Sequence, residues 1–162
     1  MIGTSNKIIT YLLNQAKDKQ FELKDYHPKR SKTQNSYAWE LMQKLADKLR
    51  TTKDEIYETM LDRYGQLLLN EEGNVVTITL SNKNDISQVE GHYKRIKSND
   101  KFTAYAIIRG SSTYDSKEMT IFIDGIISEC KLQDIETLTP QQVAGMRLKW
   151  VKEAMLVILL KK

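Results

Sequence analysis

The chain contains very little cysteine, proline and glycine for its 162 residues. Its one cysteine, Cys130, excludes an internal disulfide and any metal site built on a pair of cysteines. Two prolines and seven glycines argue against low-complexity or long disordered segments. No apolar run approaches the ~18 residues that would span a bilayer, and no secretory leader pattern opens the chain. We therefore expect a cytoplasmic protein with no membrane partner.

Histidine is equally scarce, and this limits the catalytic chemistry that can be expected. His27 and His92 are far apart, and neither has a second histidine or cysteine close by, as a zinc site needs. The chain also has no glycine-rich phosphate loop and no Gly-x-Ser-x-Gly elbow. The carboxylates of residues 115–129 do not share one helix face well enough for a two-metal nuclease. We therefore expect a protein that is not an enzyme and that needs no cofactor and no metal.

The charges are present in ordinary number but are unevenly distributed. Residues 1–50 carry ten Lys or Arg and five Asp or Glu, and residues 51–139 carry ten and fifteen. Residues 140–162 carry five and one, within a net charge of +4 for the chain. If the two basic ends meet in the fold, they form a face that attracts polyanions. If the charges are dispersed, no such face exists, and composition alone leaves both alternatives open.

Apolar periodicity predicts a largely helical chain. The predicted helices cover residues 6–17, 34–50, 52–65, 85–97 and 117–132, with a long last helix from residue 140 onward. Thr52 followed by Glu55 forms a capping box at the start of one of them. Thr139 before Pro140 is a strong start signal for the last one.

Alternating and β-branched segments predict a small antiparallel sheet. Its strands are expected over residues 21–26, 66–69, 75–80 and 102–109, and the two in the middle form a hairpin. The expected fold class is therefore α+β, mostly helical, with a compact domain over residues 1–138 and a C-terminal helix over residues 139–162. Because the run Met155–Leu160 is strongly apolar, we expect this helix to take part in a dimer. The alternative is that it docks on the core of its own chain.

The stretch from Lys29 to Trp39 leads a basic loop into the strongest predicted helix. Backbone N–H groups at a helix start carry partial positive charge, so flanking cations create a site that favours phosphate. Asn35 and Gln34 could reach phosphate, sugar or base edges. We expect Arg30 and these polar residues to be open, and we expect Trp39 to pack the helix rather than to stack on a base. The residues expected to be buried behind them are Trp39, Leu41, Leu45 and Leu49. An ordinary helix start with a solvated basic loop is the alternative.

A second junction has similar chemistry. Arg109 precedes a glycine, three hydroxyl residues and the start of the helix over 117–132. Asp115 or Ser116 as an N-cap explains only part of this segment, so a phosphate site and plain capping both stay open. The candidate nucleic-acid-binding residues are Arg30, Lys32, Gln34, Asn35 and Arg109, with Lys29 and Lys149 as secondary contacts.

The first junction also carries a family resemblance. Its pattern Arg30-Ser31-x-x-Gln34-Asn35-x-x-x-Trp39, entering an apolar helix, resembles the signature of the phage recombination proteins called NinB or Orf. The segments 114–119, 124–130 and 136–140 are similar to phage and prophage proteins of the same general type. The resemblance implies a homodimeric α+β protein that binds single-stranded DNA and helps to load a recombinase or annealing protein, without a cofactor.

Three functions follow as hypotheses. The first is a phage or prophage DNA-binding recombination accessory in the host cytoplasm, with single-stranded DNA as ligand and a host or phage recombination protein as partner. Duplex or junction DNA is an alternative ligand. The second is a protein-binding inhibitor of a host defence nuclease, such as an anti-CRISPR, whose acidic middle could imitate DNA. The third is a structure-selective nuclease, which metal-dependent cleavage would reveal.

Overall fold

The computed structural model describes residues 1–24, 26 and 29–160, and of residues 151 and 153–160 only the backbone. The described residues form five α-helices and one three-stranded sheet, which confirms the predicted α+β class. The helices are α1 (Ser5–Leu13), α2 (Lys32–Leu49), α3 (Lys53–Tyr64), α4 (Ser116–Leu132) and α5 (Pro140–Leu160). The strands are β1 (Thr77–Ser81), β2 (His92–Ser98) and β3 (Phe102–Ile108), and the short 3-10 turns are η1 (Ile86–Gln88) and η2 (Ser111–Thr113).

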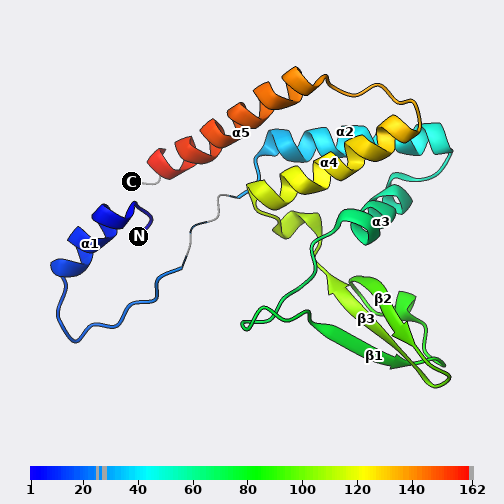
Figure 1. Ribbon diagram of the computed structural model, residues 1–162, viewed down its shortest axis with the longest axis horizontal. Helices are drawn as coiled ribbons and strands as arrows, with labels where there is room; N and C mark the ends of the chain where they lie inside the picture. Colours follow the sequence, from blue (N-terminus) through cyan, green and yellow to red (C-terminus); the bar gives the residue numbers. More distant parts are fainter. Residues whose placement is uncertain (25, 27–28, 161–162) are drawn as a thin grey trace.

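The hydrophobic core lies where α2, α3 and α4 pack against one another (Figure 1). Leu41 of α2, Leu61 of α3 and Ile126 of α4 are all buried there. The first half of α5 joins the same core through Val143 and Trp150, which are also buried. The burial of these two side chains removes apolar surface from water and so holds α5 on the body of its own chain.

Four of the helices begin with the same reciprocal hydrogen-bond pattern. The capping pairs are Ser31 with Gln34, Thr52 with Glu55, Asp115 with Glu118, and Thr139 with Gln142. In each pair the first side chain accepts from the backbone N–H of the second residue, whose own side chain accepts from the backbone N–H of the first. The pattern satisfies two backbone donors that have no partner inside the helix. It confirms the predicted starts at Thr52 and Thr139.

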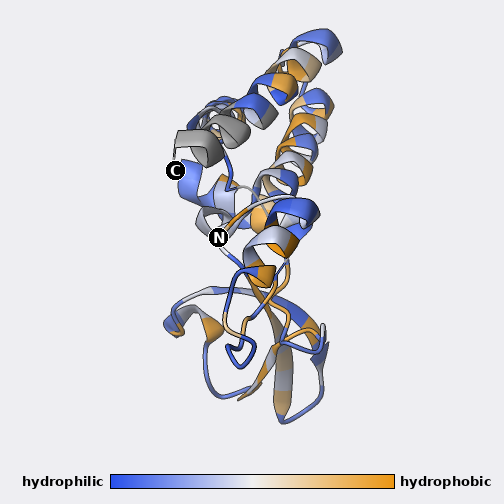
Figure 2. Cartoon of the chain, turned by 90° about the vertical axis from the view of Figure 1, so that its left-hand side faces the viewer, coloured by the Kyte–Doolittle hydropathy of each residue, from blue (hydrophilic) through white to orange (hydrophobic). Residues whose placement is uncertain are grey.

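The sheet has the strand order β1-β3-β2 and is antiparallel throughout. Thr77 pairs with Ala106 on one side of β3, and Arg95 pairs with Tyr105 on the other. Figures 1 and 2 both show the sheet projecting from one end of the helical body. β2 joins it to α3, because the Nδ1 atom of His92 lies 2.9 Å from a Glu58 carboxylate oxygen.

The helix predicted over residues 85–97 was wrong, because this segment forms η1 and then strand β2. Gly91 between them has a φ of +132°, a conformation that ends any helix there and suits glycine. β2 is an edge strand with mostly exposed side chains, so it lacks the alternation by which strands are predicted. The predicted hairpin is present as a bridge between Leu69 and Val75, but the main partner of β1 is β3.

The predicted strand over residues 21–26 was also wrong for the residues described there, 21–24 and 26, which have no regular secondary structure. His27 and Pro28, expected to form a turn, lie outside the described residues. The first helix ends at Leu13 rather than at Lys17. Residues 1–24 form an arm that extends from the helical body (Figure 1), and none of its residues is buried.

Gly125 allows α3 and α4 to pack closely. A Cβ atom at this position would lie 2.3 Å from the Cγ atom of Tyr64. The Tyr64 ring is itself fixed, because its hydroxyl donates to a Glu129 oxygen at 2.5 Å. Arg63 donates to the second oxygen of Glu129 at 2.7 Å. The Tyr64 hydrogen bond and then Arg63 lower the pKa of Glu129, so the carboxylate is the form that holds this cluster together.

We expect Gly125→Ala to destabilise the protein by about 1–3 kcal/mol, because the added methyl group overpacks a ring that cannot move away. Gly145 of α5 is the matched control, since a Cβ atom there would meet nothing within 4 Å. Gly145→Ala should stabilise the helix by up to about 1 kcal/mol. Urea unfolding followed by circular dichroism measures both changes. Equal effects of the two variants would contradict this description of the α3–α4 contact.

Candidate nucleic-acid interface

The two junctions singled out in the sequence lie side by side in the structure. α2 and α4 run in the same direction, so their N-termini are neighbours (Figure 1). Gln34 Nε2 donates to the carbonyl oxygen of Ser116 at 2.9 Å. The backbones of Lys29 and Asp115 form an isolated antiparallel bridge at the same place. We call the surface formed by residues 29–36 and 109–118 the paired helix start.

Gln34 is at the centre of this surface but is completely buried, with 0% of its area exposed. Its Oε1 atom accepts from the Ser31 N–H at 2.9 Å and from the Ser116 hydroxyl at 3.2 Å. Its Nε2 atom also donates to the Thr120 hydroxyl at 3.2 Å. The expectation that Gln34 would be open to solvent was wrong, because its side chain is enclosed between the two helices, where the bonds to Ser116 and Thr120 tie α2 to α4. The expected burial of Leu49 was wrong too, because 47% of this residue is exposed at the end of α2.

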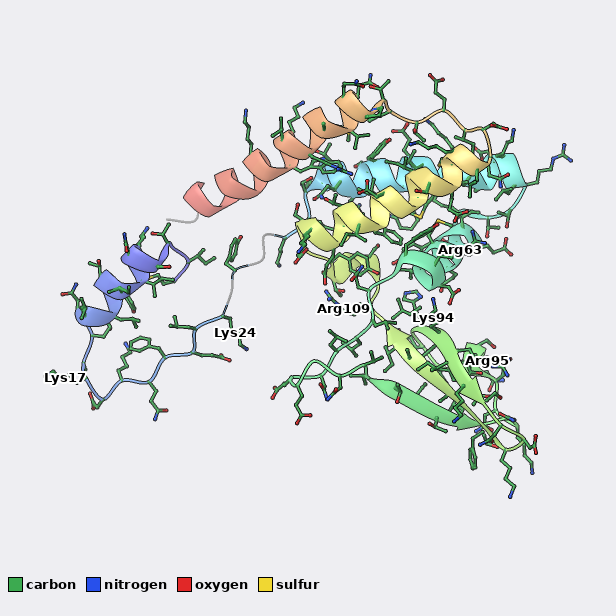
Figure 3. The ribbon with its side chains drawn as sticks, viewed as in Figure 1. Lys17, Lys24, Arg63, Lys94, Arg95 and Arg109 are labelled. Atoms are coloured by element: carbon green, nitrogen blue, oxygen red, sulfur yellow. The ribbon has the colours of Figure 1, made fainter. Side chains whose placement is uncertain are left out.

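Arg109 belongs to the paired helix start, but its charge is already compensated. It makes a two-pronged ion pair with Glu118, at 2.7 and 3.2 Å, and donates to the Thr113 carbonyl oxygen at 2.8 Å. Figure 3 shows Arg109 close to the start of α4. The neighbouring Ser111 is buried, and its N–H donates to the Tyr57 hydroxyl at 2.9 Å. The Arg109 guanidinium and the polar groups of Ser111 are therefore used inside the protein.

Arg30 is placed differently. It is half-buried, and its guanidinium donates to the side-chain oxygen of Asn35. Asn35 is neutral, so the bond orients the guanidinium without compensating its charge. Among the residues that the structure describes, Arg30 has no ion pair with a carboxylate. Its remaining N–H donors stay available for a phosphate.

Three lysines belong to the same two helix starts as Arg30. The ammonium groups of Lys29, Lys32 and Lys117 are exposed, and within the described part of the chain they have no hydrogen bond or ion pair. Asp115 is used as the N-cap of α4, where it accepts from the Glu118 N–H at 2.8 Å. Cations therefore outnumber carboxylates at the paired helix start, and the local potential is positive.

Lys149 is exposed on α5. No hydrogen bond, ion pair or ring contact of the described residues joins it to the paired helix start. Of the other cations on α5, Arg147 pairs with Asp124 of α4, whereas Lys152 is exposed. The structure thus groups all the candidate residues except Lys149.

An aromatic group next to the paired helix start was missed in the sequence. Trp39 is half-buried and stacks on Tyr57 of α3, with ring centroids 5.2 Å apart. The Lys53 ammonium lies over the indole, 5.8 Å from its centroid. His92 of β2 meets the edge of Tyr57 at 5.6 Å. These contacts join α2, α3 and β2, and because they lie between elements, no spacing within one helix predicts them.

Comparisons with protein-family models, with curated proteins and with solved structures find no match for this chain. Within the described ranges, no helix is both long enough and apolar enough to cross a membrane. No three side chains of His, Cys, Asp or Glu converge on a metal site among the described residues.

We expect Gln34→Ala to destabilise the protein by about 1–3 kcal/mol, because it removes the acceptor of two partly buried donors, the Ser31 N–H and the Ser116 hydroxyl. Gln43 is the matched control on the same helix, since its side chain bonds only Asp47 on the exposed face. Gln43→Ala should change the free energy of unfolding by less than about 0.5 kcal/mol. Urea unfolding measures both. A Gln34 variant as stable as the Gln43 variant would show that the buried amide does not hold the two helices together.

Proposed function

We propose that this chain binds single-stranded DNA at the paired helix start and acts as a phage or prophage recombination accessory. Arg30 carries the proposal, because its oriented guanidinium has a neutral side chain as its described partner. The recombination role rests on the resemblance of residues 30–39 to the NinB or Orf signature. In this proposal the chain binds DNA in the host cytoplasm, needs no cofactor and catalyses no reaction.

A half-buried cation without a counter-ion is unfavourable, and a bound anion relieves that cost. A phosphate suits Arg30 because its oxygens match the geometry of the guanidinium donors. The aligned dipoles of α2 and α4 add positive potential at the same end. Lys29, Lys32 and Lys117 extend this potential along the surface, so that more than one phosphate of a strand could bind.

We expect Arg30→Ala and Lys32→Ala each to weaken binding of a labelled oligothymidylate about three- to tenfold at low salt. Each should also reduce the slope of log affinity against log salt by about 0.7, because one phosphate contact is lost. Lys48→Ala is the matched control, since Lys48 is an exposed lysine at the opposite end of α2. Fluorescence anisotropy over a salt series measures affinity and slope together.

Two results would contradict the proposal. One is a wild-type protein that does not bind the oligonucleotide even at low salt. The other is binding that falls equally in the Lys32 and Lys48 variants and is unchanged in the Arg30 variant, because the DNA would then follow general surface charge.

A second candidate function is favoured by the N-terminal arm. Leu13 is 80% exposed, and Ile9, Phe21 and Leu23 are exposed as well. A nine-residue helix such as α1 is marginal in water unless its apolar face packs on something. We propose that the arm binds protein, either a second copy of the chain or the host nuclease of the inhibitor hypothesis.

We expect the wild-type protein to have the mass of a dimer in solution and the double variant Ile9→Ser, Leu13→Ser to have that of a monomer. Leu132→Ser is the control, because Leu132 is exposed at the end of α4, away from the arm. Light scattering coupled to gel filtration measures the mass. A monomeric wild type would exclude self-association and leave a different protein as the partner of the arm. A double variant that stays dimeric would show that the arm is not part of the dimer interface.

A further inference from the structure

We infer that Trp39 stacks on a base of the bound strand, so that the site selects single-stranded over duplex DNA. This inference rests on the proposed function and adds to it the group that recognises the base. The sequence predicted that Trp39 packs the helix rather than stacks on a base. In the structure the ring does pack on Tyr57, but it is only half-buried.

Trp39 continues the row that begins with the Arg30–Asn35 pair. Residues four apart on a helix are neighbours on one face, so Trp39 lies one turn beyond Asn35 on the same side of α2. The ring is half-buried and therefore keeps part of its surface in contact with solvent. Trp150, in contrast, is 1% exposed and serves only the core. A phosphate held by Arg30 would bring the sugar and base of the strand toward the indole.

The indole is held in place by a rigid neighbour. Tyr57 stacks on it with an interplanar angle of 29°. The Tyr57 hydroxyl accepts from the Ser111 N–H and lies 3.1 Å from the Ser111 hydroxyl oxygen, so the hydroxyl end of the ring is fixed. An aromatic side chain that is already ordered loses little freedom when a base stacks on it.

Lys53, the first residue of α3, adds a cation next to Trp39. Its ammonium lies over the indole, and no carboxylate pairs with it in the described part of the chain. The site thus has one cation, Arg30, before the start of α2 and a second, Lys53, whose ammonium lies over the Trp39 ring. Alternation of cations and exposed rings is typical of sites for single strands, because the cations bind the backbone and the rings stack on the bases. Paired bases in a duplex stack on one another and present no free face.

The test compares two ligands that share a sugar–phosphate backbone. One is an oligothymidylate, and the other is an abasic oligonucleotide of the same length. We expect Trp39→Leu to weaken binding of the oligothymidylate about tenfold and to leave binding of the abasic strand unchanged. Phe102→Leu is the control, because Phe102 is an exposed ring of the sheet. Arg30→Ala should weaken binding of both ligands.

Intrinsic fluorescence gives a readout that does not depend on a stable Leu variant. The wild-type emission should be quenched by the oligothymidylate but not by the abasic strand. In Trp39→Phe the remaining emission, from the buried Trp150, should not change with either ligand. Unquenched wild-type emission, or a Trp39→Leu variant that binds both strands normally, would overturn the inference while the Arg30 effect upheld the proposed function. A wild type that binds neither strand would overturn both.

Discussion

The hydrogen bonds of the buried Gln34 side-chain amide determine where the charged groups of the paired helix start lie. Gln34 belongs to a capping box at the start of α2 and, with the other side of its amide, binds the first turn of α4. Two helices held in this way run in the same direction and begin at the same place. A leucine of similar volume could fill the space, but it would leave the partly buried Ser31 N–H without its acceptor. The polar residue is therefore needed for the geometry of both helix starts.

This geometry separates two arginines that look alike in the sequence. Arg109 meets Glu118 in the first turn of α4, so its positive charge is balanced within the protein. Arg30 meets Asn35 in the first turn of α2, so its charge is oriented but is not balanced by any carboxylate of the described residues. The difference between a carboxylate and an amide at the third or fourth position of a helix thus decides which arginine is available to a ligand. Trp39 lies one helical turn beyond Asn35, on the same face of α2 as the side chain that orients Arg30.

Local patterns predicted much of the fold. The start of α3 follows from Thr52 and Glu55 alone, because both hydrogen bonds of a capping box lie within four residues. Strand β2 could not be predicted in the same way, since an edge strand is stabilised by β3 and not by its own alternation. For the candidate site, the sequence singled out Arg30 and its neighbours, and their contact with DNA stays a prediction. It could not show that Gln34 is buried, because that depends on Ser116, which is 82 positions away.

Photo-crosslinking would test the central claim most directly. A single-stranded oligonucleotide that contains 5-iodouracil would be bound to the full chain and irradiated, and the modified peptides would be identified by mass spectrometry. The account predicts crosslinks to Trp39 or Tyr57, within reach of the paired helix start. Crosslinks confined to the projecting sheet, where Figure 3 shows Lys94 and Arg95, or to the N-terminal arm would contradict it.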